Sequence, residues 1–257
     1  MYNEQIFNIV LWVFIAFAPC ILLLLLTTKY VAPYGKFLSN AWGSFKLPSR
    51  LGWILMEVPS VIIFTTVFCL SPNKNTGTIA LYIIWLFHYV YRSLVFPFIT
   101  KSKNEMPIML MFSAMSFQLV NTYLQAGYVL IINPEFFAGD FLTSWQFILG
   151  LVVFLIGSFI NRQADYILRN LRKGKPSQTE YYIPQGSLYK YISCPNHFGE
   201  MIIWLGWAIM LQSWVGFAFF IWTIANLLPR ARTSHKWYKE KFADYPKERK
   251  ALIPFIF

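Results

Sequence analysis

Charged residues are scarce in this chain of 257 residues: they make up 13% of it, against about 25% in soluble domains, whereas hydrophobic residues make up 57%. This shortage excludes an ordinary soluble domain. Acidic residues are the rarer sign, 11 against 22 basic ones, for a net charge of +11. That excess could suit nucleic acid, but in a membrane protein basic residues gather in cytoplasmic loops. Several apolar stretches approach the roughly 20 residues that cross a bilayer, so we predict a polytopic membrane protein.

Cysteine and the common catalytic motifs are also rare or missing. Cys20, Cys69 and Cys194 have no metal or redox spacing, and we expect reduced, structural thiols. The sequence has no GxGxxG, GxxxxGK(S/T), HExxH or GxSxG pattern, which argues against phosphate-binding loops, zinc proteases and serine hydrolases. The histidines lie far apart, so we expect no metal site. A haem held by His88 and another histidine is an alternative to a structural His88.

Long apolar runs are what the chain does have. The stretch 198–228 is too long for one untilted span, and we divide it at Gln212, Ser213 and Trp214. No Lys or Arg precedes the first run, so we expect a first span there and not a removed signal peptide. The prediction is an all-α polytopic membrane protein, one domain over 1–257, with seven transmembrane helices at roughly 7–27, 51–70, 78–99, 107–132, 144–161, 198–211 and 214–228.

The basic residues test this count. With seven spans, 20 of the 22 Lys and Arg residues fall on one side of the membrane, in segments 28–50, 100–106, 162–197 and the tail after 228. Six spans would scatter them. The positive-inside rule then places the N-terminus outside and the C-terminus in the cytosol. Both a bacterial inner membrane and the endoplasmic reticulum fit this topology.

Ionisable groups inside predicted spans are functional hypotheses by default, and three of them stand out. Glu57 interrupts the apolar run WILMEVPSVIIF, and Tyr89 and Arg92 share a helix face three residues apart. Each has a structural alternative. Glu57 could pair with a basic residue such as Arg92, Arg92 could extend towards the membrane interface, and Tyr89 could be a core aromatic with a satisfied hydroxyl.

Polar residues also form three stripes on the predicted cytosolic side. The first stripe has four residues, and an advance of 100° per residue places all four on one helix face. Within the second and third stripes the residues follow each other at intervals of four, which is also helical spacing. Stripes of this kind can be solvated or can face lipid headgroups, but three on one side suggest a polyanionic ligand, which Arg and Asn can bind without a glycine-rich loop. The stripes are Asn161, Asp165, Arg169 and Arg172; Asn196 and Glu200; and Arg230, Ser234 and Tyr238.

The same segments resemble the membrane-embedded steroid 5α-reductases (3-oxo-5α-steroid 4-dehydrogenases), from about residue 30 to the last residue. The resemblance is carried by LPSRLGWILMEVPS (47–60), HYVYRS (88–93), NRQADYILRNLRK (161–173), YYIPQGSLYKYIS (181–193), NHFGE (196–200) and DYPKERKALIPFIF (244–257). It implies a seven-helix fold, NADPH as hydride donor bound by cytosolic loops, and Δ4-3-oxo steroids as substrates. No nucleic acid or metal is implied.

Residue roles follow from the resemblance. Glu57 and Tyr89 match the pair that holds the substrate 3-oxo group, with Trp53 and Met56 as candidates for the pocket wall. The positions that match cofactor-binding ones are Asn161, Asp165, Arg172, Tyr182, Asn196, Glu200, Arg230 and Tyr238, with Tyr34 and Arg92 as further cofactor-side positions.

Two positions depart from the family pattern. Ser234 and His235 stand where members often have two histidines, and His235 lies about 140° from Arg230 around a helix. Ser113 stands where a close relative has Arg. Alternative interpretations are a reductase of another enone lipid, an isoprenylcysteine methyltransferase-like enzyme, and a lipid-binding membrane protein without enzymatic activity.

The implied reaction explains why a carboxyl and a phenol are needed. Hydride addition to a conjugated enone builds negative charge on the carbonyl oxygen, which hydrogen-bond donors in a dry cavity can stabilise. In ketosteroid isomerase, a Tyr and a neutral Asp do this. A buried carboxyl is often protonated, which would let Glu57 donate. Alternatively, an ionised Glu57 orients Tyr89.

Overall fold

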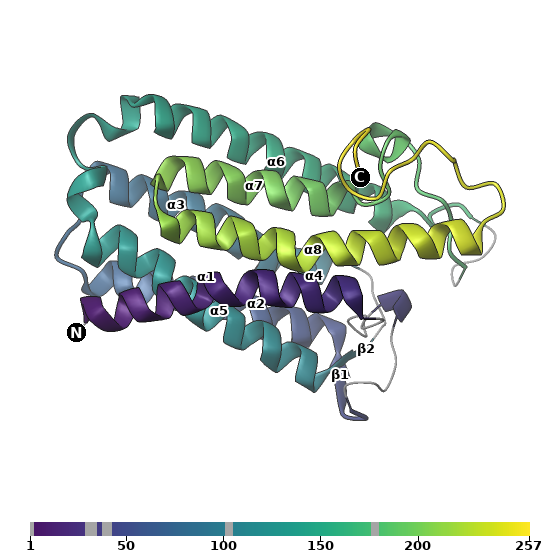
Figure 1. The fold of residues 1–257 in the computed structure, drawn as a ribbon, viewed down its shortest axis with the longest axis horizontal. Helices are drawn as coiled ribbons and strands as arrows, with labels where there is room; N and C mark the ends of the chain where they lie inside the picture. The colour runs from purple at the N-terminus through teal and green to yellow at the C-terminus, as the bar shows by residue number, and fades with distance from the viewer. Residues whose placement is uncertain (1–2, 29–34, 38–42, 101–104, 176–179) are drawn as a thin grey trace.

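The described residues form seven long helical segments. These helices run side by side along the longest axis of the molecule (Figure 1). The computed structural model describes residues 3–28, 35–37, 43–100, 105–175 and 180–257. The helices are α1 (Glu4–Thr27), α2 (Ser49–Leu70), α3 (Thr76–Val90) with its short continuation α4 (Phe96–Ile99), α5 (Ile108–Gly127), α6 (Trp145–Asn170), α7 (Pro195–Leu211) and α8 (Trp214–Lys241).

Within the described residues, five of these segments are long and apolar enough to cross a membrane: α1, α2, the segment Thr76–Ile99, α6 and α8. They support the prediction of a multi-pass membrane protein. The two others coincide with predicted spans but fall outside this set. α7 has 17 residues, and α5 carries the amides of Gln118, Asn121 and Gln125. Seven transmembrane helices therefore stay a prediction.

Local sequence explains where the helices begin. The side chain of Asn75 accepts from the Thr78 backbone amide while the Thr78 hydroxyl accepts from that of Asn75, which caps α3 at both groups. Ser144 and Ser213 cap α6 and α8 through their hydroxyls. Gln212 joins α7 to α8 in a left-handed conformation, which confirms the predicted division of the long apolar stretch.

The third predicted span is helical but not uniform. A π-helical turn covers Tyr91–Val95, between α3 and α4. Pro97 follows it and has no backbone N–H to donate to an α-helical bond. π-Turns within α-helices occur frequently at functional sites, and this one contains Arg92.

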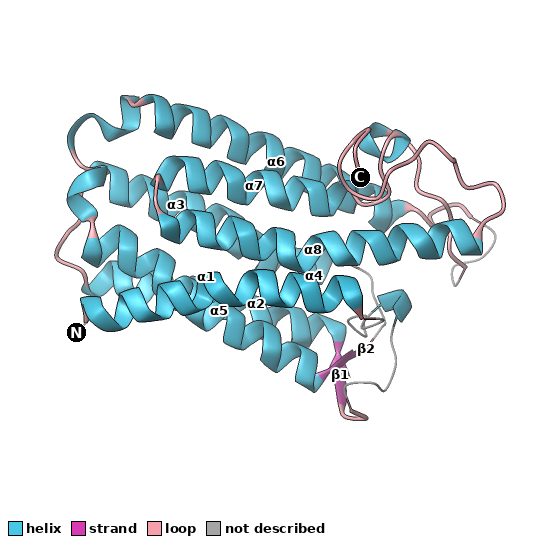
Figure 2. Ribbon diagram, viewed as in Figure 1, coloured by secondary structure: helices cyan, strands magenta, loops and turns pink. Residues whose placement is uncertain are grey.

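Two short strands, β1 (Lys46–Pro48) and β2 (Glu105–Pro107), pair antiparallel with Leu47 opposite Met106 (Figure 2). Each strand leads directly into a helix, so their pairing ties the beginnings of α2 and α5 together. Met106 then packs against Gly52 so closely that a Cβ at Gly52 would lie 2.6 Å from the Met106 sulfur. This strand pair was not predicted from the sequence.

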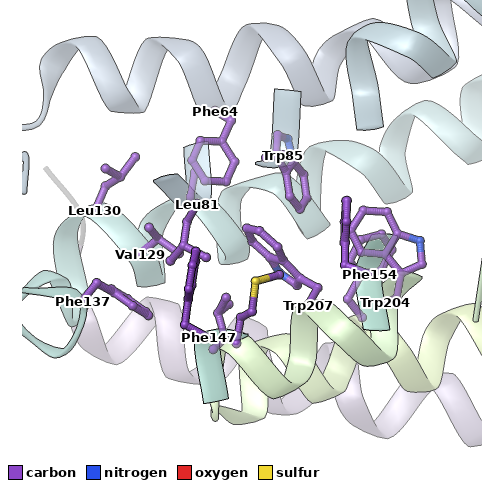
Figure 3. Close-up of a cluster of buried hydrophobic side chains, with 14 of the residues drawn as sticks. Phe64, Leu81, Trp85, Val129, Leu130, Phe137, Phe147, Phe154, Trp204 and Trp207 are labelled. Atoms are coloured by element: carbon purple, nitrogen blue, oxygen red, sulfur yellow. The ribbon is translucent and has the colours of Figure 1, made fainter. Parts of the chain in front are cut away.

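Aromatic side chains fill the centre of the bundle (Figure 3). Trp85 lies 5.3 Å from Trp207 and 5.7 Å from Trp204, measured between ring centroids. The indoles of Trp85 and Trp207 both have hydrogen-bond partners: Trp85 donates to the Ser60 carbonyl and Trp207 to the Gln125 side chain. Trp204 of this cluster also lines a cavity between the helices.

Candidate active site

A cavity of about 450 Å³ lies between α2, α3, α5, α6, α7 and α8. Ten of the fourteen residues to which the resemblance gives a role line it: Trp53, Met56, Glu57, Tyr89, Arg92, Asn161, Asp165, Asn196, Glu200 and Arg230. Three others, Arg172, Tyr182 and Tyr238, are not among its lining residues, and Tyr34 lies outside the described residues. The fold thus brings most candidate residues from four distant segments to one space.

At one end of the cavity, Glu57, Tyr89 and Gln118 form a buried polar group. Their exposed fractions are 8%, 1% and 8%. The Gln118 amide nitrogen donates to Glu57 Oε2 at 2.8 Å, and the Tyr89 hydroxyl donates to Gln118 Oε1 at 3.2 Å. Gln118 was not predicted as a site residue, because only ionisable groups stood out within the predicted spans. The available signal was the set of amides at helical spacing in 107–132, Gln118, Asn121 and Gln125.

The other end of the cavity is ionic. Arg92 forms an ion pair with Asp165 at 3.7 Å and lies over the ring of Trp53. The ion-pair partner of Arg92 is therefore Asp165 and not Glu57, which was the structural alternative for Arg92 and Glu57. Asp165 also accepts from the Asn196 side chain, which links α6 to the first turn of α7.

Glu200 is the centre of a second polar group at this end. One carboxylate oxygen lies 3.2 Å from His88 Nε2 and accepts from the Trp204 indole, and the other accepts from the Asn161 amide at 2.9 Å. His88 therefore has a protein partner, as a structural histidine would. Asn196 and Glu200 both lie on α7, as their spacing predicted.

The predicted stripe along α6 does not continue to Arg172. The helix ends at Asn170 and the chain turns, so Arg172 leaves the face shared by Asn161 and Asp165. Its Nε donates to the Glu180 carbonyl, and its guanidinium lies 5.1 Å from the Tyr181 ring centroid. The cavity does include Arg169, one turn earlier.

Beyond the cavity, Tyr238 stacks on Tyr245 with ring centroids 5.4 Å apart. Lys36 Nζ lies 4.2 Å from the Tyr238 ring centroid and 4.4 Å from that of Trp237. Burial lowers the pKa of Lys36 to about 8, partly opposed by Cys194. Lys36 belongs to no sequence motif and was not predicted as a site residue.

His235 contacts Ser193 and lies near the ring of Tyr245. Its Nδ1 lies 2.6 Å from the Ser193 hydroxyl, which also contacts the Tyr245 hydroxyl at 2.6 Å. This is compatible with the expectation that His235 does not replace the histidine that family members often have where this chain has Ser234. His235 connects α8 to the C-terminal segment instead.

The helical bundle thus encloses a cavity lined by a buried carboxyl–phenol pair and by a group of ionic residues, within a protein that has several helices apolar enough to cross a membrane. Comparisons with known proteins give the family. Residues 104–257 match the family model described as 3-oxo-5-alpha-steroid 4-dehydrogenase. The chain belongs to this family, which makes it an oxidoreductase acting on CH–CH bonds.

Curated relatives extend the match to most of the chain. A steroid 5-alpha-reductase DET2 of Gossypium hirsutum is 42% identical over 234 residues, covering 88% of each chain. A 3-oxo-5-alpha-steroid 4-dehydrogenase 1 of Bos taurus is 39% identical over 231 residues, again covering 88% of each. A DET2 of Solanum lycopersicum, 37% identical, covers 99% of this chain and 98% of its own. Membership favours a reductase over a methyltransferase-like enzyme or a lipid-binding protein.

Proposed function

We propose that the protein reduces the Δ4 double bond of 3-oxo-Δ4 steroids to 5α-dihydro products with NADPH, with hydride addition at C5. The observation that carries this proposal is the cavity with Glu57 and Tyr89 at one end and Asn161, Asp165 and Arg230 at the other. It suits a lipophilic enone whose carbonyl meets the carboxyl–phenol end. Names of relatives from plants and a mammal support the steroid class.

The ionic end fits an anionic cofactor. Among the described residues, three buried polar atoms of cavity-lining side chains have no hydrogen-bond partner: the nitrogens Arg169 Nη1 and His197 Nδ1 and the hydroxyl oxygen of Thr100. Buried donors are normally paired, so these nitrogens fit a ligand that supplies acceptor oxygens. We assign NADPH to Tyr34, Arg92, Asn161, Asp165, Arg172, Tyr182, Asn196, Glu200, Arg230 and Tyr238. Bound there, NADPH would supply the hydride.

The chain's own residues then act on the substrate carbonyl. Tyr89 and Glu57 hold the 3-oxo oxygen and stabilise the negative charge that builds on it. The buried surroundings strengthen these hydrogen bonds because few waters compete with them. Trp53, Met56, Leu110 and Phe117 form apolar wall around them. We also place the N-terminus outside and the loop-rich end with the cofactor in the cytosol, following the basic residues.

The first experiment is NADPH oxidation by detergent-purified protein with and without testosterone or progesterone, with products identified by mass and retention time. We expect steroid-dependent oxidation and a 5α-dihydro product. NADPH binding without steroid-dependent oxidation would move the substrate to another enone lipid. Failure to bind NADPH would overturn the proposed cofactor and its site.

Arg172→Ala is expected to weaken NADPH binding without changing turnover at saturating cofactor. The loss of one charged hydrogen-bonding group is worth about 1.5–3 kcal/mol, or about tenfold or more in Kd. Fluorescence titration with NADPH measures it. Arg162→Ala is the control, because Arg162 is an arginine of α6 whose guanidinium lies over Phe87 and Tyr91 and is not among the residues to which NADPH is assigned. Equal affinities for both variants would contradict the role of Arg172.

The affinity for NADPH is expected to fall as pH rises through about 8, where Lys36 beside Tyr238 loses its charge. A protonated Lys36 attracts the anionic cofactor, so its contribution is present below this pH and lost above it. One such partly exposed charge is worth up to about 1 kcal/mol, or about fivefold in Kd. Titrations from pH 6.5 to 9.5 check it. Lys36→Gln should flatten the profile, and a profile unchanged by that substitution would count against the assignment.

A further inference from the structure

Gln118 occupies a position where the helix pattern calls for an apolar residue. Leu110, Ala114 and Gln118 follow each other at intervals of four on the face of α5 that lines the cavity. The first two are apolar, as expected of a face buried in a membrane protein. Gln118 replaces the next apolar residue with an amide that is 8% exposed. Burying an amide lowers the stability of a protein unless the polar atoms of the amide form hydrogen bonds.

Both ends of this amide are paired, and with the two proposed catalytic residues. Its nitrogen donates to Glu57 Oε2 at 2.8 Å and its oxygen accepts from the Tyr89 hydroxyl at 3.2 Å. A carboxamide is suited to this because it carries donors at one end and an acceptor at the other. Gln118 thus connects α2 to α3 through the site.

The direction of these bonds has a consequence for the substrate. A phenol has one proton, and the Tyr89 proton is directed to Gln118 Oε1. A ketone that binds Tyr89 must therefore replace Gln118 as the acceptor. The oxygen–oxygen distance of 3.2 Å exceeds the usual 2.7–2.8 Å of an O–H···O bond, so this bond is the weaker of the two and the easier to exchange.

We propose that Gln118 is a positioning residue of the reductase. Its amide nitrogen fixes the Glu57 carboxyl through Oε2 and leaves the other carboxyl oxygen for the ligand. Its amide oxygen holds the Tyr89 hydroxyl in place until the ligand's carbonyl oxygen takes over the hydrogen bond. The inference rests on the proposed function, because it assumes that Glu57 and Tyr89 hold a carbonyl group.

The test compares Gln118→Met, Gln118→Glu and Leu119→Ala. Met keeps the length and the unbranched shape of Gln but loses both hydrogen bonds. Glu keeps the shape and replaces the donor facing Glu57 with a second carboxyl. Leu119 is the next residue of α5, exposed on the bundle surface and outside the cavity, and serves as control. Steroid-dependent NADPH oxidation gives kcat and KM from pH 5 to 9, and titration gives the Kd for NADPH.

Gln118→Met is expected to lower kcat by about 10–100-fold, the usual effect of losing a residue that orients a reactive group. The Kd for NADPH and the melting temperature should stay close to those of Leu119→Ala. Gln118→Glu should be active at low pH, where two carboxyls can share a proton, and lose activity as pH rises, because two adjacent carboxylates repel. Wild type should lack this fall.

Two outcomes would overturn the inference: wild-type kcat and KM in Gln118→Met, or a Gln118→Glu profile parallel to that of wild type. Parallel loss at every pH would indicate a purely structural role. The result is separable from the proposed function. Full activity in Glu57→Gln and Tyr89→Phe would remove the proposed catalytic pair, whereas their inactivity beside fully active Gln118 variants would remove only the role of Gln118.

Discussion

Glu57→Gln and Tyr89→Phe are each expected to lower turnover by about 10²–10³-fold, or about 2.7–4 kcal/mol of transition-state stabilisation. Phe removes the phenolic donor and leaves the ring in its buried place. Gln at position 57 can still accept from Gln118 but has no acidic O–H to offer. Both substitutions preserve shape, so the loss would come from chemistry at the carbonyl oxygen.

The cofactor end should be unaffected by either change. The ion pair of Arg92 is with Asp165, and Glu200 contacts His88 and Asn161, so neither group has Glu57 or Tyr89 as its ion-pair or hydrogen-bond partner. The Kd for NADPH is therefore expected to stay within about twofold of wild type, because Phe keeps the ring that packs against His88 and Gln keeps the size of Glu57. A large rise in that Kd would mean that the two ends are coupled.

Tyr82→Phe is the matched control for Tyr89→Phe. Tyr82 lies on the same helix, and its hydroxyl contacts Thr65 at 3.1 Å outside the cavity. It should reduce turnover little. The variant carrying both Glu57→Gln and Tyr89→Phe should lose little more than the worse single one, because both residues act on one oxygen and such effects are not additive. Full activity in both single variants would refute the assignment.

The helices could be predicted because crossing a membrane requires long apolar segments, and polar residues in this sequence mark where one such segment ends and the next begins. The turn at Gln212 and Ser213 is the sharpest case, since two polar residues end one helix and cap the next. The end of α8 was less predictable. The apolar run stops near 228, but the helix continues to Lys241, past Pro229, through residues whose charged side chains favour helix as well as solvent.

Tertiary pairings were beyond the sequence. β1 and β2 are three residues each and lie far apart in the chain, so neither has an alternating pattern long enough to recognise. Gln118 gave no charge signal, and its importance appears only once Glu57 and Tyr89 are placed beside it. Arg172 was misplaced on the α6 face because no strong breaker marks the end of that helix at Asn170.

Gly199→Ala is expected to destabilise the protein by about 1–3 kcal/mol, because α6 and α7 leave no room for a methyl group. A Cβ at Gly199 would lie 2.5 Å from the Asn161 backbone nitrogen, and one at Gly157 would lie 2.8 Å from the Gly199 carbonyl oxygen. Small residues are what let membrane helices approach this closely. The corresponding fall in Tm is about 2–12 °C, measured by thermal unfolding in detergent.

Gly199→Ala should change the cofactor site locally, in addition to lowering the stability of the whole protein. Its close neighbour Asn161 donates to Glu200 and to the Asn196 carbonyl at the proposed cofactor end, so moving the α6 backbone there should also raise the Kd for NADPH. Gly206 repeats the same close contact against Phe154, with a Cβ 2.5 Å from its backbone nitrogen, two turns further along α7. Gly206→Ala should therefore cost similar stability and leave the Kd unchanged.

Ser158→Ala is the neutral control, since it removes a buried hydroxyl without a partner among the described residues, beside Gly157. It should leave Tm unchanged or raise it slightly. Equal rises in Kd for Gly199→Ala and Gly206→Ala would show that cofactor binding follows overall stability alone. Unchanged Tm values in both would contradict the close packing of α6 on α7. A rise confined to Gly199→Ala would show that the glycine contact holds Asn161 and Glu200 in register, so helix packing itself sets the geometry of the cofactor end.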